Sequence, residues 1–159
     1  MTKFTRLDSA SDDPHASREP TPNVPIHAPA IPWITWREGE RFAGGHIPLA
    51  TLGGAVSIGV NLVQLDPGTQ SCPFHYHLRE EEHFYVLSGR CVLRSGEERH
   101  VMESGDYVCF PAGTGVGHAT LNPFAEPCRM LVVVTPRAHP LEVCVFPDSG
   151  EARIRALKA

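Results

Sequence analysis

From about residue 37 onward, the chain is a succession of short apolar runs separated by turns rich in Gly, Pro, Ser and Asn. The runs are enriched in Val, Ile, Phe and Tyr, as strands are, and they cover residues 55–65, 82–87, 91–93, 100–102, 107–110, 118–121, 129–134 and 141–146. No segment keeps an apolar stripe at helical spacing over three turns. This pattern predicts an all-β chain that folds as an antiparallel sandwich or barrel.

The first 32 residues have a different character, because they contain six prolines. Proline fixes φ and lacks a backbone N–H, so this density disfavours both helix and strand pairing. Apolar residues then stand between positions 24 and 36, and they are Val24, Ile26, Ile31, Trp33, Ile34 and Trp36. We therefore predict an extended, partly flexible N-terminal arm over residues 1–36 and a single barrel domain over residues 37–159. The apolar part of the arm is expected to lie along the barrel or along a neighbouring subunit.

The charge and hydropathy of the chain exclude several classes of partner. Fourteen basic and eighteen acidic residues give a net charge of −4, and no cluster of Lys and Arg is present. Nucleic acid is therefore not an expected partner, since phosphate binding needs concentrated positive charge. The most apolar long run, residues 55–65, is interrupted by Asn61 and Gln64 and is too short to span a bilayer. No membrane association is expected.

Five cysteines stand sixteen or more residues apart, and no Cys-x-x-Cys pair occurs. Neither a dithiol redox motif nor a closed zinc site is therefore expected, although Cys72 stands three residues before His75. Residues 1–8 lack the apolar run of a secretory signal, so we expect reduced thiols and a cytoplasmic location.

The placement of histidines is the strongest chemical signal. His75 and His77 are two residues apart, so on a strand both imidazoles project to one face with Cα atoms about 6.6 Å apart. A short turn then brings Glu81 or Glu82 back, and His118 begins a later strand. Imidazole nitrogens with one carboxylate suit Fe, Mn, Ni, Co, Cu or Zn better than Ca or Mg. Spacing alone leaves Glu81 and Glu82 as rival ligands.

The spacing of these residues resembles the two sequence motifs of the cupin superfamily. The residues that match the first motif are Gly68, His75, His77, Glu82 and Gly89, and those that match the second are Gly105, Pro111, Gly113, His118 and Asn122. The resemblance spans about residues 37–155 and implies a jelly-roll barrel. It further implies that His75, His77, Glu82 and His118 hold one divalent metal ion per chain. The six-residue interval to Gly89 favours Glu82 over Glu81, which turns His83 to the opposite face.

An octahedral ion with four protein ligands keeps two positions for water, substrate or dioxygen. The sequence therefore suggests a metal-dependent enzyme with dioxygenase or isomerase chemistry on an oxyacid, a sugar or a phenolic compound. The alternative is a non-catalytic protein that binds a small ligand, such as a metabolite sensor, and a purely structural metal site is a third possibility. A general acid or base stays open among Tyr76, Tyr85, Tyr107, His83 and Cys109.

Further expectations concern the surroundings of the metal and the assembly. Phe84 and Val86 share strand parity with Glu82 and should line the barrel interior. Cys109 is expected to be a small buried side chain, and the histidines predicted to lie on the surface are His15, His27, His46 and His139. Exposed sheet edges and the apolar arm predict a two-fold homodimer.

Overall fold

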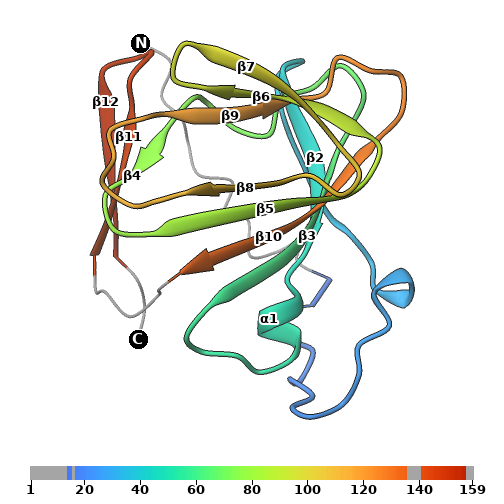
Figure 1. Ribbon diagram of the computed structural model, residues 1–159. Helices are drawn as coiled ribbons and strands as arrows, with labels where there is room; N and C mark the ends of the chain where they lie inside the picture. Colours follow the sequence, from blue (N-terminus) through green and yellow to red (C-terminus); the bar gives the residue numbers. More distant parts are fainter. Residues whose placement is uncertain (1–13, 16, 136–140, 157–159) are drawn as a thin grey trace.

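The computed structural model describes residues 14–15, 17–135 and 141–156, so the expectation for His139 lies outside the described residues. Figure 1 shows a barrel of β-strands with the N-terminal arm running below it. The largest sheet has the order β1-β2-β3-β10-β5-β8, and its strands are β1 (Ile34–Glu38), β2 (Phe42–Ile47), β3 (Gly59–Leu65), β10 (Cys128–Thr135), β5 (Glu81–Ser88) and β8 (Tyr107–Phe110). Every ladder within it is antiparallel.

Two three-stranded sheets complete the barrel. One has the order β7-β6-β9, with β7 (Glu98–Glu103), β6 (Arg90–Ser95) and β9 (His118–Leu121). The other has the order β12-β11-β4, with β12 (Glu151–Ala156), β11 (Leu141–Phe146) and β4 (Tyr76–His77). A backbone bridge between His75 and His118 joins the two. The prediction of an all-β, antiparallel jelly-roll barrel is confirmed.

The core lies between the large sheet and the β7-β6-β9 sheet, because strand alternation turns one apolar face of each sheet inward. Its fully or nearly buried members are Leu65, Phe84, Val86, Cys91, Leu93, Met102, Cys128, Met130 and Val132. Phe84 and Val86 face this interior, as their parity predicted. In the described part of the chain, the helical segments are η1 (Ala28–Ala30) and α1 (Leu49–Leu52), and no helix is long and apolar enough to cross a membrane.

The arm covers part of the outer face of the same chain's large sheet. Ile31, Ile47 and Leu52 form a second buried cluster there, and Trp33 packs against it. The backbone N–H of Thr21 also donates to the carbonyl of Leu52 at 2.9 Å. The apolar part of the arm was expected to lie along its own barrel or along a neighbouring subunit. The structure places it along its own barrel.

Strands β1 and β2 were not among the predicted apolar runs, and β1 begins at Ile34, within the predicted arm. Their sequence is unusual because Gly44 and Gly45 stand in the middle of β2. A Cβ at Gly44 would overlap the carbonyl oxygen of Gln64 and the ring of Trp36, so the glycine permits close packing of β1, β2 and β3.

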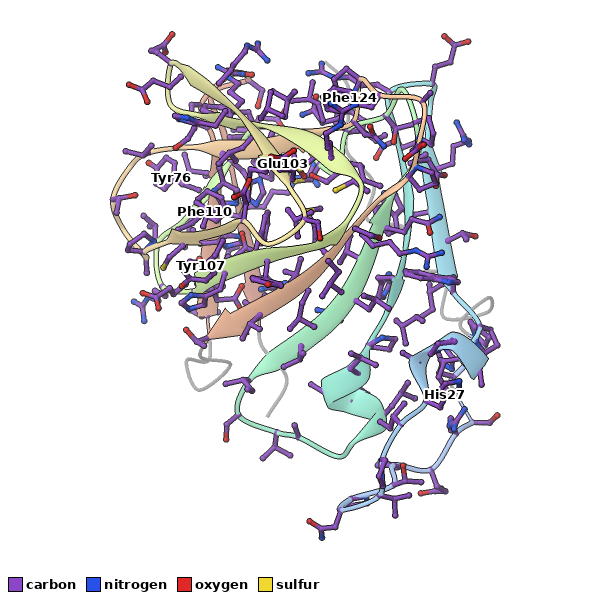
Figure 2. The ribbon with its side chains drawn as sticks, turned by 45° about the vertical axis from the view of Figure 1, so that its right-hand side comes forward. His27, Tyr76, Glu103, Tyr107, Phe110 and Phe124 are labelled. Carbon is purple, nitrogen blue, oxygen red and sulfur yellow. The ribbon has the colours of Figure 1, made fainter. Side chains whose placement is uncertain are left out.

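The expected surface position is wrong for His15, which is 8% exposed and has its Nε2 2.9 Å from the carbonyl oxygen of Pro32. The hydrogen bond explains the difference, because a buried polar side chain needs a partner. His46 is half-buried in β2 beside Trp36, with ring centroids 5.9 Å apart, and does not stand in a turn. His27 is exposed on the arm, as expected (Figure 2).

Candidate metal centre

The four predicted ligands lie together inside the barrel, at the junction of three sheets. His75 precedes β4, His77 ends it, Glu82 stands near the start of β5, and His118 opens β9. Two backbone hydrogen bonds fix the first and last of these to each other. His75 N donates to His118 O at 3.1 Å, and His118 N donates to His75 O at 2.7 Å.

The three imidazoles converge on a single oxygen atom. Glu82 Oε2 lies 2.9 Å from His118 Nε2, 3.5 Å from His77 Nε2 and 3.8 Å from His75 Nε2. The three histidine side chains are between 2% and 11% exposed. Convergence of three Nε2 atoms and one carboxylate in a nearly dry site is the arrangement that a divalent transition metal requires.

The opposite ring nitrogens explain how two of the imidazoles are oriented. His75 Nδ1 lies 2.8 Å from the carbonyl oxygen of Pro73, so Nδ1 donates and Nε2 is the atom that faces Glu82. His77 Nδ1 faces two buried carboxylates, Glu142 Oε1 at 3.4 Å and Glu80 Oε2 at 3.7 Å. Both rings therefore turn Nε2 toward Glu82.

His118 is held by ring contacts. Its ring stacks on Phe110 with centroids 3.7 Å apart and an interplanar angle of 10°, and Phe84 meets it edge-on at 5.9 Å. The buried Nδ1 of His118 has no hydrogen-bond partner among the described residues. The aromatic rings fix the imidazole plane and keep water from this side of the cluster.

Burial alone would raise the pKa of Glu82, but the hydrogen bond from His118 and the charges of the three histidines lower it to about 2. Burial lowers the pKa of His77 and of His118, which favours their neutral, metal-binding form. Burial also acts downward on His75, but Cys72 and Glu82 raise its pKa to about 9. A metal ion would have to displace the His75 proton.

The rival carboxylate, Glu81, lies outside this cluster. It points to the other face of β5, where its Oε1 is 3.0 Å from His83 Nε2. The predicted orientation of His83 away from Glu82 is confirmed. Among the described residues, Glu82 is thus the carboxylate that faces the three histidines.

Besides Glu80, two residues of β11 that were not predicted lie near the cluster. Cys144 pairs with His77 in the ladder, and its Sγ lies within 4.8 Å of a ring nitrogen of His75 and of His77. Burial raises the pKa of Cys144 to about 12, so it is a neutral thiol at pH 7. Glu142 is 1% exposed. Neither residue belongs to a motif, and only the β4–β11 pairing brings them to the site.

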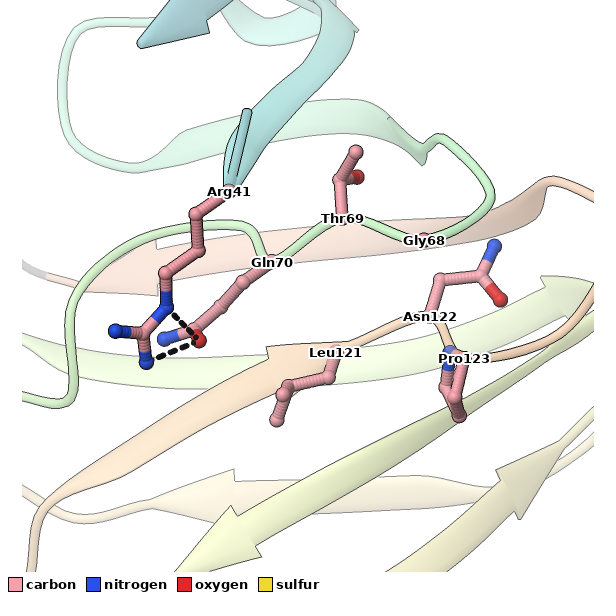
Figure 3. A pocket seen from close by; sticks show the side chains of 7 residues that line it. All are labelled: Arg41, Gly68, Thr69, Gln70, Leu121, Asn122 and Pro123. Carbon is pink, nitrogen blue, oxygen red and sulfur yellow. Dashed lines mark hydrogen bonds between the residues drawn. The ribbon is translucent and has the colours of Figure 1, made fainter. Parts of the chain in front are cut away.

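Two further motif residues, Gly68 and Asn122, have structural roles. Asn122 is buried, and its Nδ2 donates to the carbonyl oxygens of Leu65 and Glu126 at 3.0 and 2.8 Å. The N–H of Gly68, whose φ is +76°, donates to the carbonyl of Asn122 at 2.7 Å. Figure 3 shows the shallow pocket of about 140 Å³ beside them, where Arg41 donates two hydrogen bonds to Gln70. These hydrogen bonds tie the turn at Gly68 to the segment that follows β9.

Comparisons with known proteins agree with this geometry. The sequence model of the Cupin domain family matches residues 61–134. One similar solved structure is that of a sugar phosphate isomerase from a cupin superfamily, from Silicibacter pomeroyi. It is 30% identical, and the match has a TM-score of 0.71 and covers 84% of this chain and 92% of that one. A putative sugar phosphate isomerase from Acidithiobacillus ferrooxidans is 27% identical, with a TM-score of 0.64 over 72% of this chain and 76% of that one.

A curated relative adds a second activity. The quercetin 2,3-dioxygenase of Bacillus subtilis is 35% identical over 80 residues, which are 48% of this chain. The match spans about a quarter of the length of that enzyme, 24%. The dioxygenase activity is therefore that of a much longer protein.

Proposed function

The chain belongs to the cupin superfamily, and we propose that it is a metal-dependent enzyme that acts on a small, oxygen-rich molecule. The proposed ligands of the divalent ion inside the barrel, one per chain, are His75, His77, Glu82 and His118. The observation that carries the proposal is the convergence of three Nε2 atoms on Glu82 Oε2, at 2.9 to 3.8 Å. Fe, Mn, Ni, Co, Cu and Zn all accept this donor set.

Isomerisation of a sugar-type substrate is the reaction we favour. It is supported by the sugar phosphate isomerase of S. pomeroyi, of which the match covers 92%. A bound ion supplies a Lewis acid that polarises the carbonyl and hydroxyl oxygens of a substrate. In this chain, ionised Glu82 offsets part of the ion's charge, and the rings of Phe84 and Phe110 keep water from one side of the site.

Cys144 is the proton-bearing side chain that the fold adds beside the proposed ligands. Its thiol is protonated at neutral pH because burial raises its pKa to about 12. Sugar isomerisation needs a base that accepts a carbon-bound proton, and a thiol that is neutral at pH 7 can only donate its proton, for example to an oxygen of the substrate. Cys144 is therefore the first residue to substitute in a search for the proton donor, ahead of Tyr76, which pairs with Val145.

Dioxygenase chemistry is the second candidate. It is supported by the 35% identity with quercetin 2,3-dioxygenase over 80 residues. A non-catalytic barrel that binds a small ligand or senses a metabolite remains the alternative of a different class. The three hypotheses share the same metal ligands and differ in what happens after the ligand binds.

The metal centre is tested first, with Mn(II), because manganese prefers nitrogen and oxygen donors to sulfur. Electron paramagnetic resonance should show one bound ion per chain in the parent protein. Glu82→Gln should weaken binding at least about 100-fold, more than the loss of a ligand's hydrogen-bond partner costs. Glu81→Gln is the matched control and should bind as the parent does. Equal binding by Glu82→Gln and the parent would overturn the assignment.

The reaction is tested with the metal-loaded protein in D₂O. An isomerase should exchange a carbon-bound hydrogen of one sugar in a panel of free and phosphorylated aldoses and ketoses, as read by NMR. Oxygen uptake with catechols, flavonoids or oxyacids would support the dioxygenase instead. Saturable binding without turnover in either assay would favour the non-catalytic ligand-binding barrel.

A further inference from the structure

The outer face of β5 carries a second group of metal-binding side chains, separate from the centre inside the barrel. Glu81 and His83 project from β5, and Tyr107 and Cys109 project from the neighbouring strand β8. His83 stands opposite Cys109 in the ladder, and Tyr85 stands opposite Tyr107. We call Glu81, His83, Tyr107 and Cys109 the outer cluster. It shares no residue with the inner centre.

The atoms of the outer cluster lie close enough to bind one ion. His83 Nε2 is 3.0 Å from Glu81 Oε1. One ligand atom each from Glu81, His83 and Cys109 lies within 4.8 Å of the other two. A tetrahedral zinc ion with bonds of about 2.0 to 2.3 Å spans such a triangle after small side-chain rotations.

Tyr107 contacts the imidazole of His83 in a way that is compatible with metal binding. Its Oη lies 2.7 Å from His83 Nδ1, and the two rings stack with centroids 6.1 Å apart. A phenol can either donate or accept a hydrogen bond. The imidazole can therefore move its proton from Nε2 to Nδ1 without losing this contact. The freed lone pair of Nε2 then points toward Glu81.

We propose that the outer cluster is a second metal site, in which Glu81, His83 and Cys109 bind Zn(II) or a chemically similar ion. The donor set of one nitrogen, one oxygen and one sulfur suits a borderline-soft ion, whereas the three nitrogens and one oxygen of the inner centre hold no sulfur. Three protein ligands leave a fourth position to water. The side chains of His83 and Glu81 are 25% and 40% exposed, so an ion reaches them directly from solvent.

An alternative use of the same residues is a nucleophilic cysteine activated by His83. That use needs a thiol whose pKa is lowered. Burial and the charge of Glu81 instead raise the pKa of Cys109, and His83 contacts Tyr107 and Glu81. The arrangement therefore lacks the thiol–imidazole pair of a cysteine nucleophile.

The experiment measures cobalt and zinc binding to the full chain. Co(II) bound through a thiolate should give a sulfur-to-cobalt charge-transfer absorption in the near ultraviolet. The band should disappear in Cys109→Ser and persist in Cys144→Ser, which removes the thiol beside the inner centre. Dialysis against micromolar zinc should leave two ions per chain in the parent protein and one in Cys109→Ser or His83→Ala.

The outcomes separate this proposal from the inner centre. A band that persists in Cys109→Ser, or that disappears only in Cys144→Ser, would overturn the outer site. An outer ion that is lost on dialysis would also overturn it. Thermal unfolding of Cys109→Ser without metal controls for a folding defect. Mn(II) binding reports on the inner centre by itself, so either site can fail without the other.

Discussion

The two faces of strand β5 carry the same kinds of side chain in opposite surroundings. On the inner face, Glu82 is enclosed by three histidines and is 13% exposed. On the outer face, Glu81 pairs with one histidine and is 40% exposed. A shift of one residue along a strand exchanges the two faces, because side chains alternate. Glu81 and Glu82 are adjacent in sequence and therefore lie in two different environments.

The comparison shows how surroundings change the chemistry of one residue type. The histidines around Glu82 hold its pKa near 2 although burial opposes this. At the outer face, Glu81 is more exposed, and the sulfur of Cys109 is what distinguishes the site. Enclosure by several imidazoles thus defines the inner centre, whereas the type of donor atom defines the outer cluster.

Removal of two inner imidazoles should have the largest effect. His75→Ala/His77→Ala is expected to abolish Mn(II) binding at the inner centre, because two of the four proposed ligands are lost. Zinc binding at the outer cluster should persist in the same variant. Isothermal titration calorimetry measures the manganese affinity of the inner centre and the zinc affinity of the outer cluster. An unchanged manganese affinity would show that His75 and His77 do not set the inner face apart as metal ligands.

Stability should also distinguish the two faces. Phe84→Ala on the inner face is expected to cost about 3–5 kcal/mol of unfolding free energy, because it leaves a cavity beside Phe110 and His118. Tyr85→Ala, at an outer position that is 43% exposed, should cost about 1 kcal/mol. Urea denaturation of both variants checks this. Similar losses for the two would contradict the assignment of the core to one face.

Glu142→Gln should weaken manganese binding at the inner centre about 10- to 100-fold, because it removes the charge that faces Nδ1 of His77 at 3.4 Å. The glutamine can still accept the N–H of Leu78 and Arg79, which Glu142 Oε1 accepts at 3.0 and 3.3 Å. A purely structural role would therefore leave the affinity unchanged. Glu80→Gln is the control with a smaller expected loss, since Glu80 is paired with Arg155.

Tyr107→Phe should give the smallest change. Loss of the hydroxyl that lies 2.7 Å from His83 Nδ1 should lower zinc affinity at the outer cluster by about 10-fold. The inner centre should bind manganese as before. Chelator competition measures the zinc affinity, and an unchanged value would show that Tyr107 does not orient His83.

Local sequence patterns predicted much of the barrel, and period-two spacing placed His75 and His77 on one face. The grouping of these two with Glu82 and His118, and the choice of Glu82 over Glu81, came from the resemblance to the cupin motifs. With Glu82 chosen, the opposite orientation of His83 followed from strand alternation. The features that depend on neighbours in sequence could be predicted from local patterns, whereas the place of His118 needed the resemblance.

Features that depend on distant strands could not be predicted in this way. Cys144 and Glu142 reach the inner centre because β11 pairs with β4, across more than 60 residues of sequence. Strand β2 was missed because Gly44 indicates a turn in isolation, whereas here it allows close packing against Gln64. His15 was assigned to the surface because its partner, the carbonyl of Pro32, is seventeen residues away. The homodimer and the cytoplasmic location stay predictions.

The paired backbone hydrogen bonds between His75 and His118, at 3.1 and 2.7 Å, have a consequence for metal exchange. Main-chain pairing holds these two residues at a fixed separation without a bound ion. Little conformational entropy of the chain would therefore be lost when an ion binds. An ion can then leave and another can take its place without unfolding of the barrel. Because this donor set accepts several divalent ions, the free-metal supply at the time of loading would decide which ion the proposed centre holds.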